Sequence, residues 1–352
     1  MTLRLALIPC MLLALSGCSS DSDKSPQTDD EFAASVEKAM HDTLGKEVDA
    51  LQKAAVALQK AAPSAARGWS ATEDAAAIEA TTKAWLAARA AYERSEGAIA
   101  PLFPDTDAAI DARYEDFLEP LRPDGDANLF DGTGVTGMHA IERILFADTT
   151  PASVIQVEST LEGYAPAAWP ATAEETAAFK TELCQQLVKD TTDLQANWKA
   201  TKLDLQGAYG GLIALMNEQR EKVNKAATEE EESRYAQRTL ADIRDNLAGT
   251  RVAYGLFRNW VKSKEGGADV DASIEAGFDE LDAAYSSLTG DAFPALPAGF
   301  SAEAPSDADK ATDFGKLFVR VQEAVDPNKA GSVVDGMNKA AVLMNFPEFI
   351  PE

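Results

Sequence analysis

Histidine and cysteine are scarce in this chain of 352 residues, which contains two histidines and three cysteines. Cys10 and Cys18 lie near the N-terminus, so Cys184 stands alone in the remainder of the chain. This excludes a disulfide framework within the main body of the protein. Cys184 lies in a helical pattern, and we expect it to be a buried structural thiol.

Clustered lysine and arginine are missing as well. The chain has 32 basic and 58 acidic residues and a formal net charge of −26. Because nucleic acids are bound by clusters of cationic side chains, the composition argues against a nucleic-acid partner. It argues equally against adhesion to an anionic membrane surface. A strongly acidic protein attracts cations, although acidity also serves solubility outside the cytoplasm.

A third absence is the sustained alternation of polar and apolar residues that half-buried strands require. Almost every long segment instead has the apolar spacing of a helix, and clusters of proline and glycine separate these segments. We therefore predict an all-α protein. The predicted helices span residues 31–62, 71–98, 108–118, 136–147, 152–161, 174–201, 203–227, 229–264, 270–288, 308–325 and 331–344.

The helices are expected to form two bundles that meet near residues 200–205, because each half supplies enough long helices to enclose a core. The N-terminal bundle would span residues 31–202 and the C-terminal bundle residues 203–352. Trp85, Trp198 and Trp260 lie inside helical patterns and are predicted to anchor the cores.

The N-terminus has only a short apolar run, residues 5–15, which cannot span a bilayer as a permanent helix. Arg4 precedes this run, and Leu-Ser-Gly-Cys at 15–18 resembles the lipobox of bacterial lipoproteins. The resemblance implies a signal peptide over residues 1–17, a lipid-bearing Cys18 and a flexible tether over residues 18–30. An ordinary cleaved signal is the alternative. Ser19 after the cysteine favours a lipid anchor in the outer membrane, with the protein facing the periplasm.

Residues 137–142 read Gly-Met-His-Ala-Ile-Glu and place an imidazole and a carboxylate three positions apart in a predicted helix. This spacing brings His139 and Glu142 onto one helix face, with Cβ atoms about 5–6 Å apart, close enough to hold one metal ion. The alternative is a buried histidine–glutamate pair without a ligand. The other histidine, His41, has no supporting motif and is expected to be an ordinary helix-face residue.

Several acids could join this pair. Glu93 and Glu96 end one predicted helix, and more carboxylates follow within residues 105–111. In an antiparallel bundle, facing helices can bring such acids to His139 and Glu142. One imidazole among carboxylates favours a cation such as iron, manganese or calcium, with zinc or copper tolerated.

The pattern Gly-x-His-x-x-Glu at 137–142 resembles the signature of imelysin-like proteins. That family is named for an insulin-cleaving membrane protease and also includes EfeO-type periplasmic iron-uptake proteins. Residues 85–96, 105–113, 209–218 and 239–249 are similar to further motifs of the family, so the resemblance covers about residues 35–345. It implies an all-α fold of two helical bundles outside the cytoplasm.

The resemblance also implies a metal site. The ligands that it suggests are His139, Glu142, Glu93, Glu96, Asp111 and Glu218. Residues 236–239 read Ala-Gln-Arg-Thr where EfeO-type proteins usually have Ser-His-Thr-Asp, so that histidine is missing here.

Three functions are compatible with these features, and the sequence favours the first. This is a cell-envelope lipoprotein that binds a metal ion, chiefly iron, through the His/carboxylate site and passes it to an iron permease or a haem protein. The second is an imelysin-type metallopeptidase, although the His-Glu-x-x-His arrangement of zinc peptidases is missing. The third is a non-catalytic helical lipoprotein that binds a partner, with the Asp- and Gly-rich residues 120–134 as a surface loop of weak calcium-binding potential.

Overall fold

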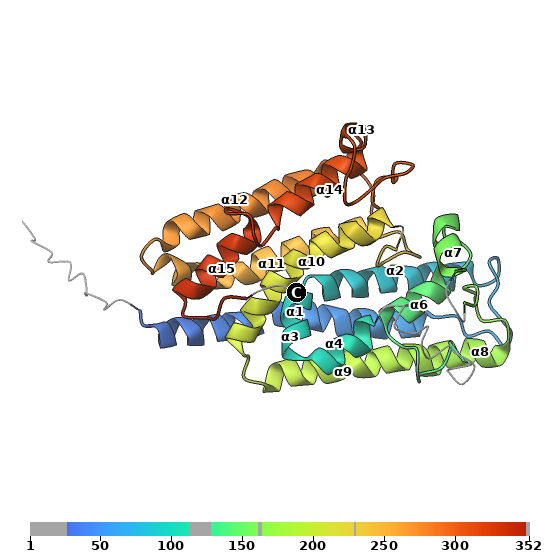
Figure 1. Ribbon diagram of the computed structural model, residues 1–352. Coiled ribbons are helices and arrows are strands. Elements are labelled where there is room, and N and C mark those ends of the chain that lie inside the picture. The colour runs from blue at the N-terminus through green and yellow to red at the C-terminus, as the bar shows by residue number, and fades with distance from the viewer. Residues whose placement is uncertain (1–26, 113–127, 161–163, 229, 350–352) are drawn as a thin grey trace, which may run out of the picture.

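The protein is all-α, as predicted (Figure 1). The computed structural model describes residues 27–112, 128–160, 164–228 and 230–349, and within these ranges there is no strand. The expected signal peptide, the expected lipid-bearing Cys18, most of the tether and most of the 120–134 loop lie outside the described residues. None of the described helices combines the length and the apolar character that crossing a bilayer requires.

The helices have the following bounds. In chain order they are α1 (Asp29–Ala61), α2 (Ala75–Glu93), α3 (Glu96–Leu102), α4 (Pro104–Asp111), α6 (Met138–Leu145), α7 (Ala152–Glu158), α8 (Ala173–Ala178), the π-helical turn η1 (Phe179–Leu183), α9 (Cys184–Ala200), α10 (Leu205–Ala227), α11 (Thr239–Lys262), α12 (Gly267–Ser286), α13 (Asp307–Lys310), α14 (Asp313–Ala324) and α15 (Val333–Leu343).

Local sequence explains where the long helices begin and which face they bury. Thr28 and Glu31 form a reciprocal capping box at the start of α1, which satisfies two of the free backbone N–H groups there. Apolar side chains then recur every three or four residues along one face of α1. The buried members are Val36, Met40, Leu44, Val48, Leu51, Ala54, Ala55 and Leu58.

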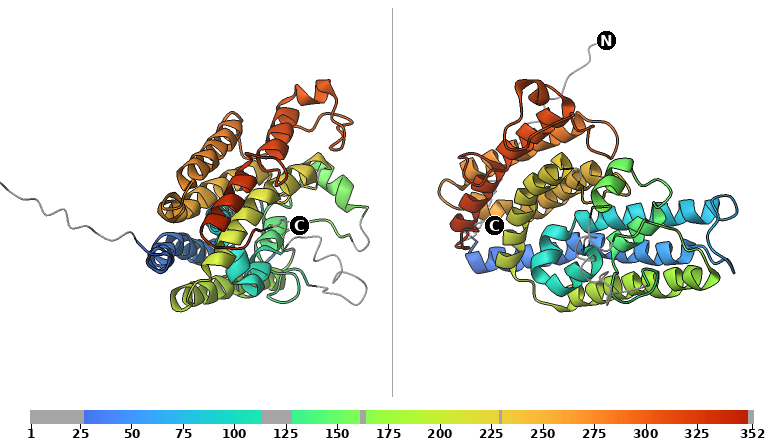
Figure 2. Two further views of the ribbon diagram at one scale, coloured as in Figure 1. Left: turned by 60° about the vertical axis from the view of Figure 1, so that its left-hand side comes forward. Right: turned by 45° about the vertical axis from the view of Figure 1, so that its right-hand side comes forward.

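Two groups of helices lie side by side in the molecule. In the first, α1 packs between α2 and α9; in the second, α11 packs against α10 and α12, and α12 in turn packs against α14 and α15 (Figures 1 and 2). The groups meet where α10 contacts α3 and α11 contacts α2. The predicted boundary near residue 203 falls in the connection between α9 and α10.

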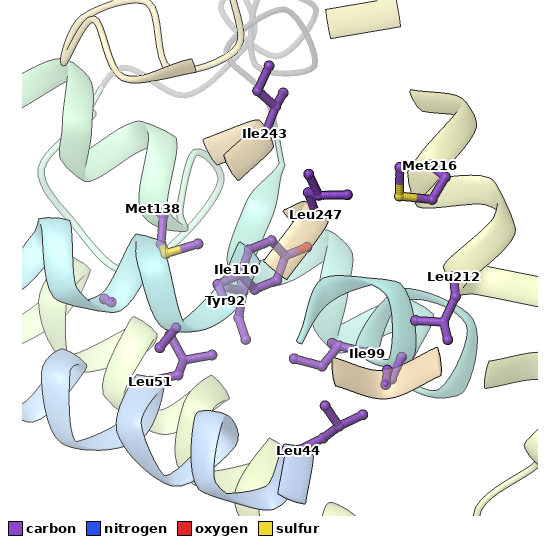
Figure 3. Packing of buried hydrophobic residues seen from close by; sticks show 14 of the residues in the cluster. Leu44, Leu51, Tyr92, Ile99, Ile110, Met138, Leu212, Met216, Ile243 and Leu247 are labelled. Carbon is purple, nitrogen blue, oxygen red and sulfur yellow. The ribbon is translucent and has the colours of Figure 1, made fainter. Parts of the chain in front are cut away.

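A single hydrophobic cluster runs through both groups. Figure 3 shows its central part, where Tyr92 and Ile110 lie between Leu51 of α1 and Leu247 of α11. All three tryptophans predicted as core anchors, Trp85, Trp198 and Trp260, are buried. Cys184 is also buried, as expected, and burial raises the pKa of its thiol.

Four predicted helices differ clearly from the observed ones. In place of the predicted helix 108–118, α4 begins at Pro104 and ends at Asp111, and residues 113–118 lie outside the described residues. The predicted helix 71–98 is divided into α2 and α3 near Ser95, whose hydroxyl donates back to the Ala91 carbonyl. The predicted helix 308–325 is divided before α14, because the Thr312 side chain caps a new helix by accepting from the Gly315 N–H. The predicted helix 229–264 begins only at Thr239. We call the non-helical residues before it, 230–238, the 230–238 connection.

Candidate metal centre

The turn that begins α6 brings two segments of backbone into contact. Gly137 has φ +92°, and a Cβ at this position would lie 2.8 Å from the carbonyl oxygens of both Ala109 and Ile110 in α4. Only glycine fits both the left-handed backbone and this close approach. The start of α6 is thereby pressed against the end of α4, so that His139 lies next to Asp111.

His139 is almost completely buried, with 2% of its side chain exposed. Its Nδ1 lies 2.6 Å from Glu142 Oε2, so the predicted His-x-x-Glu pair is formed within α6. Its Nε2 lies 3.5 Å from Asp111 Oδ1 and has no hydrogen-bond partner among the described residues. A buried polar atom without a partner is costly in a folded protein, and it marks a place where a ligand or an ion can bind.

Glu232, which the sequence did not single out, completes the cluster. One ligand atom from each of Asp111, His139 and Glu232 lies within 4.8 Å of the others. Glu232 reaches the cluster because the 230–238 connection leaves the helical path, with Gln237 at φ +52°. The backbone N–H groups of Tyr235 and Ala236 donate to Glu142 Oε1 at 3.0 and 2.8 Å, which holds the connection against α6.

A buried arginine from α2 lies among the same carboxylates. Arg89 is fully buried and forms ion pairs with Glu93, Asp111, Glu232 at 2.7 Å and Asp242 at 3.5 Å. These acids come from α2, α4, the 230–238 connection and α11, so Arg89 links both groups of helices. Burial alone would lower the pKa of the guanidinium, but the four acids raise it well above its usual value.

Lys222 of α10 is a second buried cation. Its Nζ lies 2.9 Å from Glu232 Oε2, 3.5 Å from Glu93 Oε2 and 3.1 Å from Asn246 Oδ1. The two oxygens of Glu232 are thus shared between Arg89 and Lys222. Asn246 of α11 also donates to Glu93 at 2.5 Å and to Glu96 at 2.8 Å.

The remaining predicted ligands lie on the Lys222 side of this network. Glu93 is buried between Arg89 and Asn246, and Glu96 is buried next to Asn246. Glu218, on α10, is only partly buried, but its charge contributes to raising the pKa of Lys222. The structure therefore brings His139 and Asp111 together, places Glu142 on the opposite ring nitrogen, and gathers Glu93 and Glu96 around Lys222.

Burial perturbs the acid–base properties of the centre. It raises the pKa of Asp111, although the positive charge of Arg89 opposes this change. It raises the pKa of Asp242 to about 7, despite the nearby Arg89. Burial and Arg89 both lower the pKa of His139, but its hydrogen bond to Glu142 and the charge of Asp111 outweigh them and leave the pKa above its usual value.

His41, the other histidine, takes no part in this cluster. It lies on α1 at intermediate exposure, and its ring meets Trp198 edge-on with 6.2 Å between centroids. This agrees with the expectation of an ordinary helix-face residue.

The donor atoms suit a cation. An imidazole nitrogen without a partner faces two carboxylates, a ligand set that iron, manganese and zinc all accept. The acids around Arg89 and Lys222 outnumber these two cationic side chains. Fold and centre together define an all-α protein with a buried imidazole–carboxylate cluster between two groups of helices.

The chain belongs to the imelysin family. The sequence profile of that family, Peptidase M75, matches residues 38–324. The chain is also similar to the iron uptake system component EfeO of Escherichia coli (strain K12) and of Shigella flexneri. In both cases the identity is 27% over 205 residues, which are 58% of this chain and 44% of the relative. The chain thus spans less than half the length of these curated relatives.

One solved structure has the same fold. It is the crystal structure of a protein from Parabacteroides distasonis ATCC 8503 described as an iron-regulated protein A precursor. The TM-score is 0.58, and the alignment covers 92% of this chain and 97% of that one. The sequence identity is 14%, so this likeness concerns the fold alone.

Proposed function

We propose that this protein captures iron outside the cytoplasm and hands it to a membrane permease or a haem protein. The observation that carries the proposal is the buried Nε2 of His139, which has no hydrogen-bond partner among the described residues and faces Asp111 and Glu232. The names of the EfeO relatives, components of an iron uptake system, support iron as the cargo. Lipidation at Cys18 and an outer-membrane anchor facing the periplasm belong to the same proposal.

In this proposal the ligands are His139 through Nε2, Asp111 and Glu232. The cation competes with Arg89 for the two carboxylates, since Arg89 forms ion pairs with both. Arg89 and Lys222 compensate part of the negative charge before iron arrives, which favours reversible capture over permanent retention. Glu93, Glu96 and Glu218 contribute negative charge around Lys222.

Iron binding should weaken as the pH falls, because each ligand must lose its proton before it binds a metal. The pKa values of His139 and Asp111 are both raised, His139 by its hydrogen bond to Glu142 against the effect of burial, and Asp111 by burial. Protons therefore compete with the metal at higher pH than they would for free side chains. An acidic environment would promote release.

The test is calorimetric titration of the protein with Fe²⁺ under anaerobic conditions, with chelated Fe³⁺, and with Zn²⁺, Cu²⁺ and Ca²⁺ for comparison. We expect saturable iron binding that is lost in His139→Ala and weakened at least tenfold in Asp111→Asn and Glu232→Gln. His41→Ala is the matched control, because it removes the only other histidine of the chain. Binding that survives His139→Ala unchanged would refute the proposed site.

Hydrolysis, which the family name Peptidase M75 raises as the alternative, receives less support from the centre. A metallopeptidase needs an open metal position and a general base free to take a proton from water. Both oxygens of Glu142 already accept hydrogen bonds from His139 and from the 230–238 connection. Cleavage of unfolded insulin chains that disappears in His139→Ala would nevertheless establish peptidase activity.

A further inference from the structure

The Glu142 carboxylate is fully engaged within the protein. Its side chain is completely buried. Oε2 lies 2.6 Å from His139 Nδ1, and Oε1 accepts from the backbone N–H groups of Tyr235 and Ala236. The atoms that cluster around the candidate cation position belong to Asp111, His139 and Glu232. Glu142 lies on the other edge of the imidazole ring.

This arrangement determines where the proton of the His139 ring resides. An ionised carboxylate only accepts hydrogen bonds, so the ring must donate from Nδ1. In the neutral ring Nε2 then carries the lone pair, and Nε2 is the atom that faces Asp111. Histidines that bind metals in proteins usually donate their second ring N–H to a carboxylate or a carbonyl in this way.

The other oxygen of Glu142 holds the 230–238 connection. Two consecutive backbone N–H groups, from Tyr235 and Ala236, donate to it. Further hydrogen bonds hold the same connection, from the Tyr235 hydroxyl to Glu158 at 2.5 Å and from the Ser233 hydroxyl to Asp242. Glu232 lies on this connection, so the carboxylate that orients His139 also fixes the backbone that carries Glu232.

We infer that Glu142 is a positioning residue and not a metal ligand: it selects the tautomer of His139 with a free Nε2, and it holds Glu232 at the same centre. The inference rests on the proposed function for its metal, but the tautomer can be observed without any metal. It assigns the glutamate of the Gly-x-His-x-x-Glu pattern a role that spacing alone does not reveal. One carboxylate thereby joins α6 to the segment between α10 and α11.

Glu142→Gln separates the effect of Glu142 on the His139 tautomer from its hold on the 230–238 connection. A glutamine can keep the bonds to Tyr235 and Ala236 by presenting its oxygen to their N–H groups, which turns its NH₂ group toward Nδ1. That group is a donor, so Nδ1 must accept and the proton moves to Nε2. We therefore expect a folded protein with the opposite tautomer, in which iron binds 10- to 100-fold more weakly, the usual range for loss of such a partner.

The tautomer is read by ¹⁵N NMR of protein labelled at histidine, at alkaline pH where the ring is neutral. The chain has two histidines, so His41→Gln identifies the signals of each. The metal-free wild type should show a protonated Nδ1 at His139, and Glu142→Gln a protonated Nε2. Affinity for Fe²⁺ is measured on the same samples. Glu158→Gln is the matched control, because it alters another buried acid that bonds Tyr235 and should leave the tautomer unchanged.

The outcomes are distinguishable. A protonated Nε2 at His139 in the metal-free wild type overturns the inference, as does unchanged Fe²⁺ affinity in a folded Glu142→Gln variant. If the wild type shows the expected tautomer but binds no metal, the proposed function fails while the positioning role stands. If Glu142→Gln does not fold, the inference is tested by adding Zn²⁺ to the wild type and recording the same ¹⁵N spectra. A change in the Nε2 signal that shows metal binding there, with Nδ1 still protonated, supports the inference. Metal binding at Nδ1 contradicts it.

Discussion

At the scale of single residues, Arg89 is the cation that holds the acids of the centre together. It is fully buried and pairs with Glu93, Asp111, Glu232 and Asp242. Arg89→Met keeps much of the side-chain volume but leaves these carboxylates facing one another. Removing one partner from a buried ion pair costs about 3–5 kcal/mol of unfolding free energy. We expect a loss of this size in urea unfolding at neutral pH, with partial recovery as acid protonates the carboxylates.

The matched control is Arg320→Met. Arg320 also pairs with a glutamate, Glu280, but both side chains are about half exposed. Exposed pairs contribute at most about 1 kcal/mol, so this variant should unfold almost like the wild type. Equal losses in the two variants would show that the buried network has no special importance for stability.

Residue spacing predicted part of the centre. The i, i+3 relation placed His139 and Glu142 on one face of α6, and their side chains do meet. The sequence also pointed to Asp111, which ends α4. It could not reveal Glu232 or the buried cations Arg89 and Lys222, because their places depend on how distant helices pack. One signal was available: Glu232 lies in an unusually acidic run, residues 229–232.

At the scale of elements, α10 and α3 depend on a glycine at their contact. A Cβ on Gly211 would lie 2.1 Å from the Gly97 carbonyl oxygen and 2.5 Å from Pro101 Cγ. Gly211→Ala therefore forces the two helices apart, and overpacking of this kind costs about 1–3 kcal/mol. We expect a lower melting temperature and a loss of unfolding free energy in that range.

Gly255→Ala is the control for the effect of alanine on helix propensity. Gly255 lies within α11, and a Cβ there would meet nothing within 4 Å. Alanine should stabilise this helix by about 0.5–1 kcal/mol, since glycine costs that much in a helix interior. A stabilising effect of Gly211→Ala would mean that the helices do not touch as described.

The connection between α10 and α11 shows where helical patterns mislead. Residues 229–264 have a continuous helical pattern, yet α11 begins only at Thr239. The backbone N–H groups of Tyr235 and Ala236 donate to Glu142, which lies far away in the sequence. Tertiary hydrogen bonds replace the helical ones here, and local propensity cannot anticipate them. The long uninterrupted helices α1, α10 and α12, whose stability comes from one apolar face, were predicted within a few residues.

At the scale of the whole molecule, buried acids make stability depend on pH in two opposite ways. Burial raises the pKa of Asp107 to about 6, although the Tyr92 hydroxyl donates to it. Its folded form holds a proton more tightly than the unfolded chain does, so its contribution to stability decreases as the pH rises toward 6. Asp107→Asn should therefore increase the unfolding free energy by about 1–3 kcal/mol at neutral pH and change little near pH 4.

The pKa of Asp271 is shifted in the opposite direction from that of Asp107. Burial would raise its pKa, but hydrogen bonds from Arg258, Lys262 and Tyr254 bring it below its usual value. Its contribution to stability is present when the pH lies above the pKa that Asp271 has in the unfolded chain. The contribution is lost as the pH falls through the lower pKa of the folded protein. Asp271→Asn should destabilise the protein at neutral pH and less in acid. Urea unfolding of both variants at several pH values checks the two signs, and parallel pH profiles would contradict them.

The central claim is that a cation binds where the two groups of helices meet. Anomalous diffraction at the iron absorption edge, from crystals grown with Fe²⁺, tests it most directly. We predict one strong peak at coordination distance from His139 Nε2, between Asp111 and Glu232. Strong iron peaks elsewhere in the molecule, with none beside that nitrogen, would contradict the account.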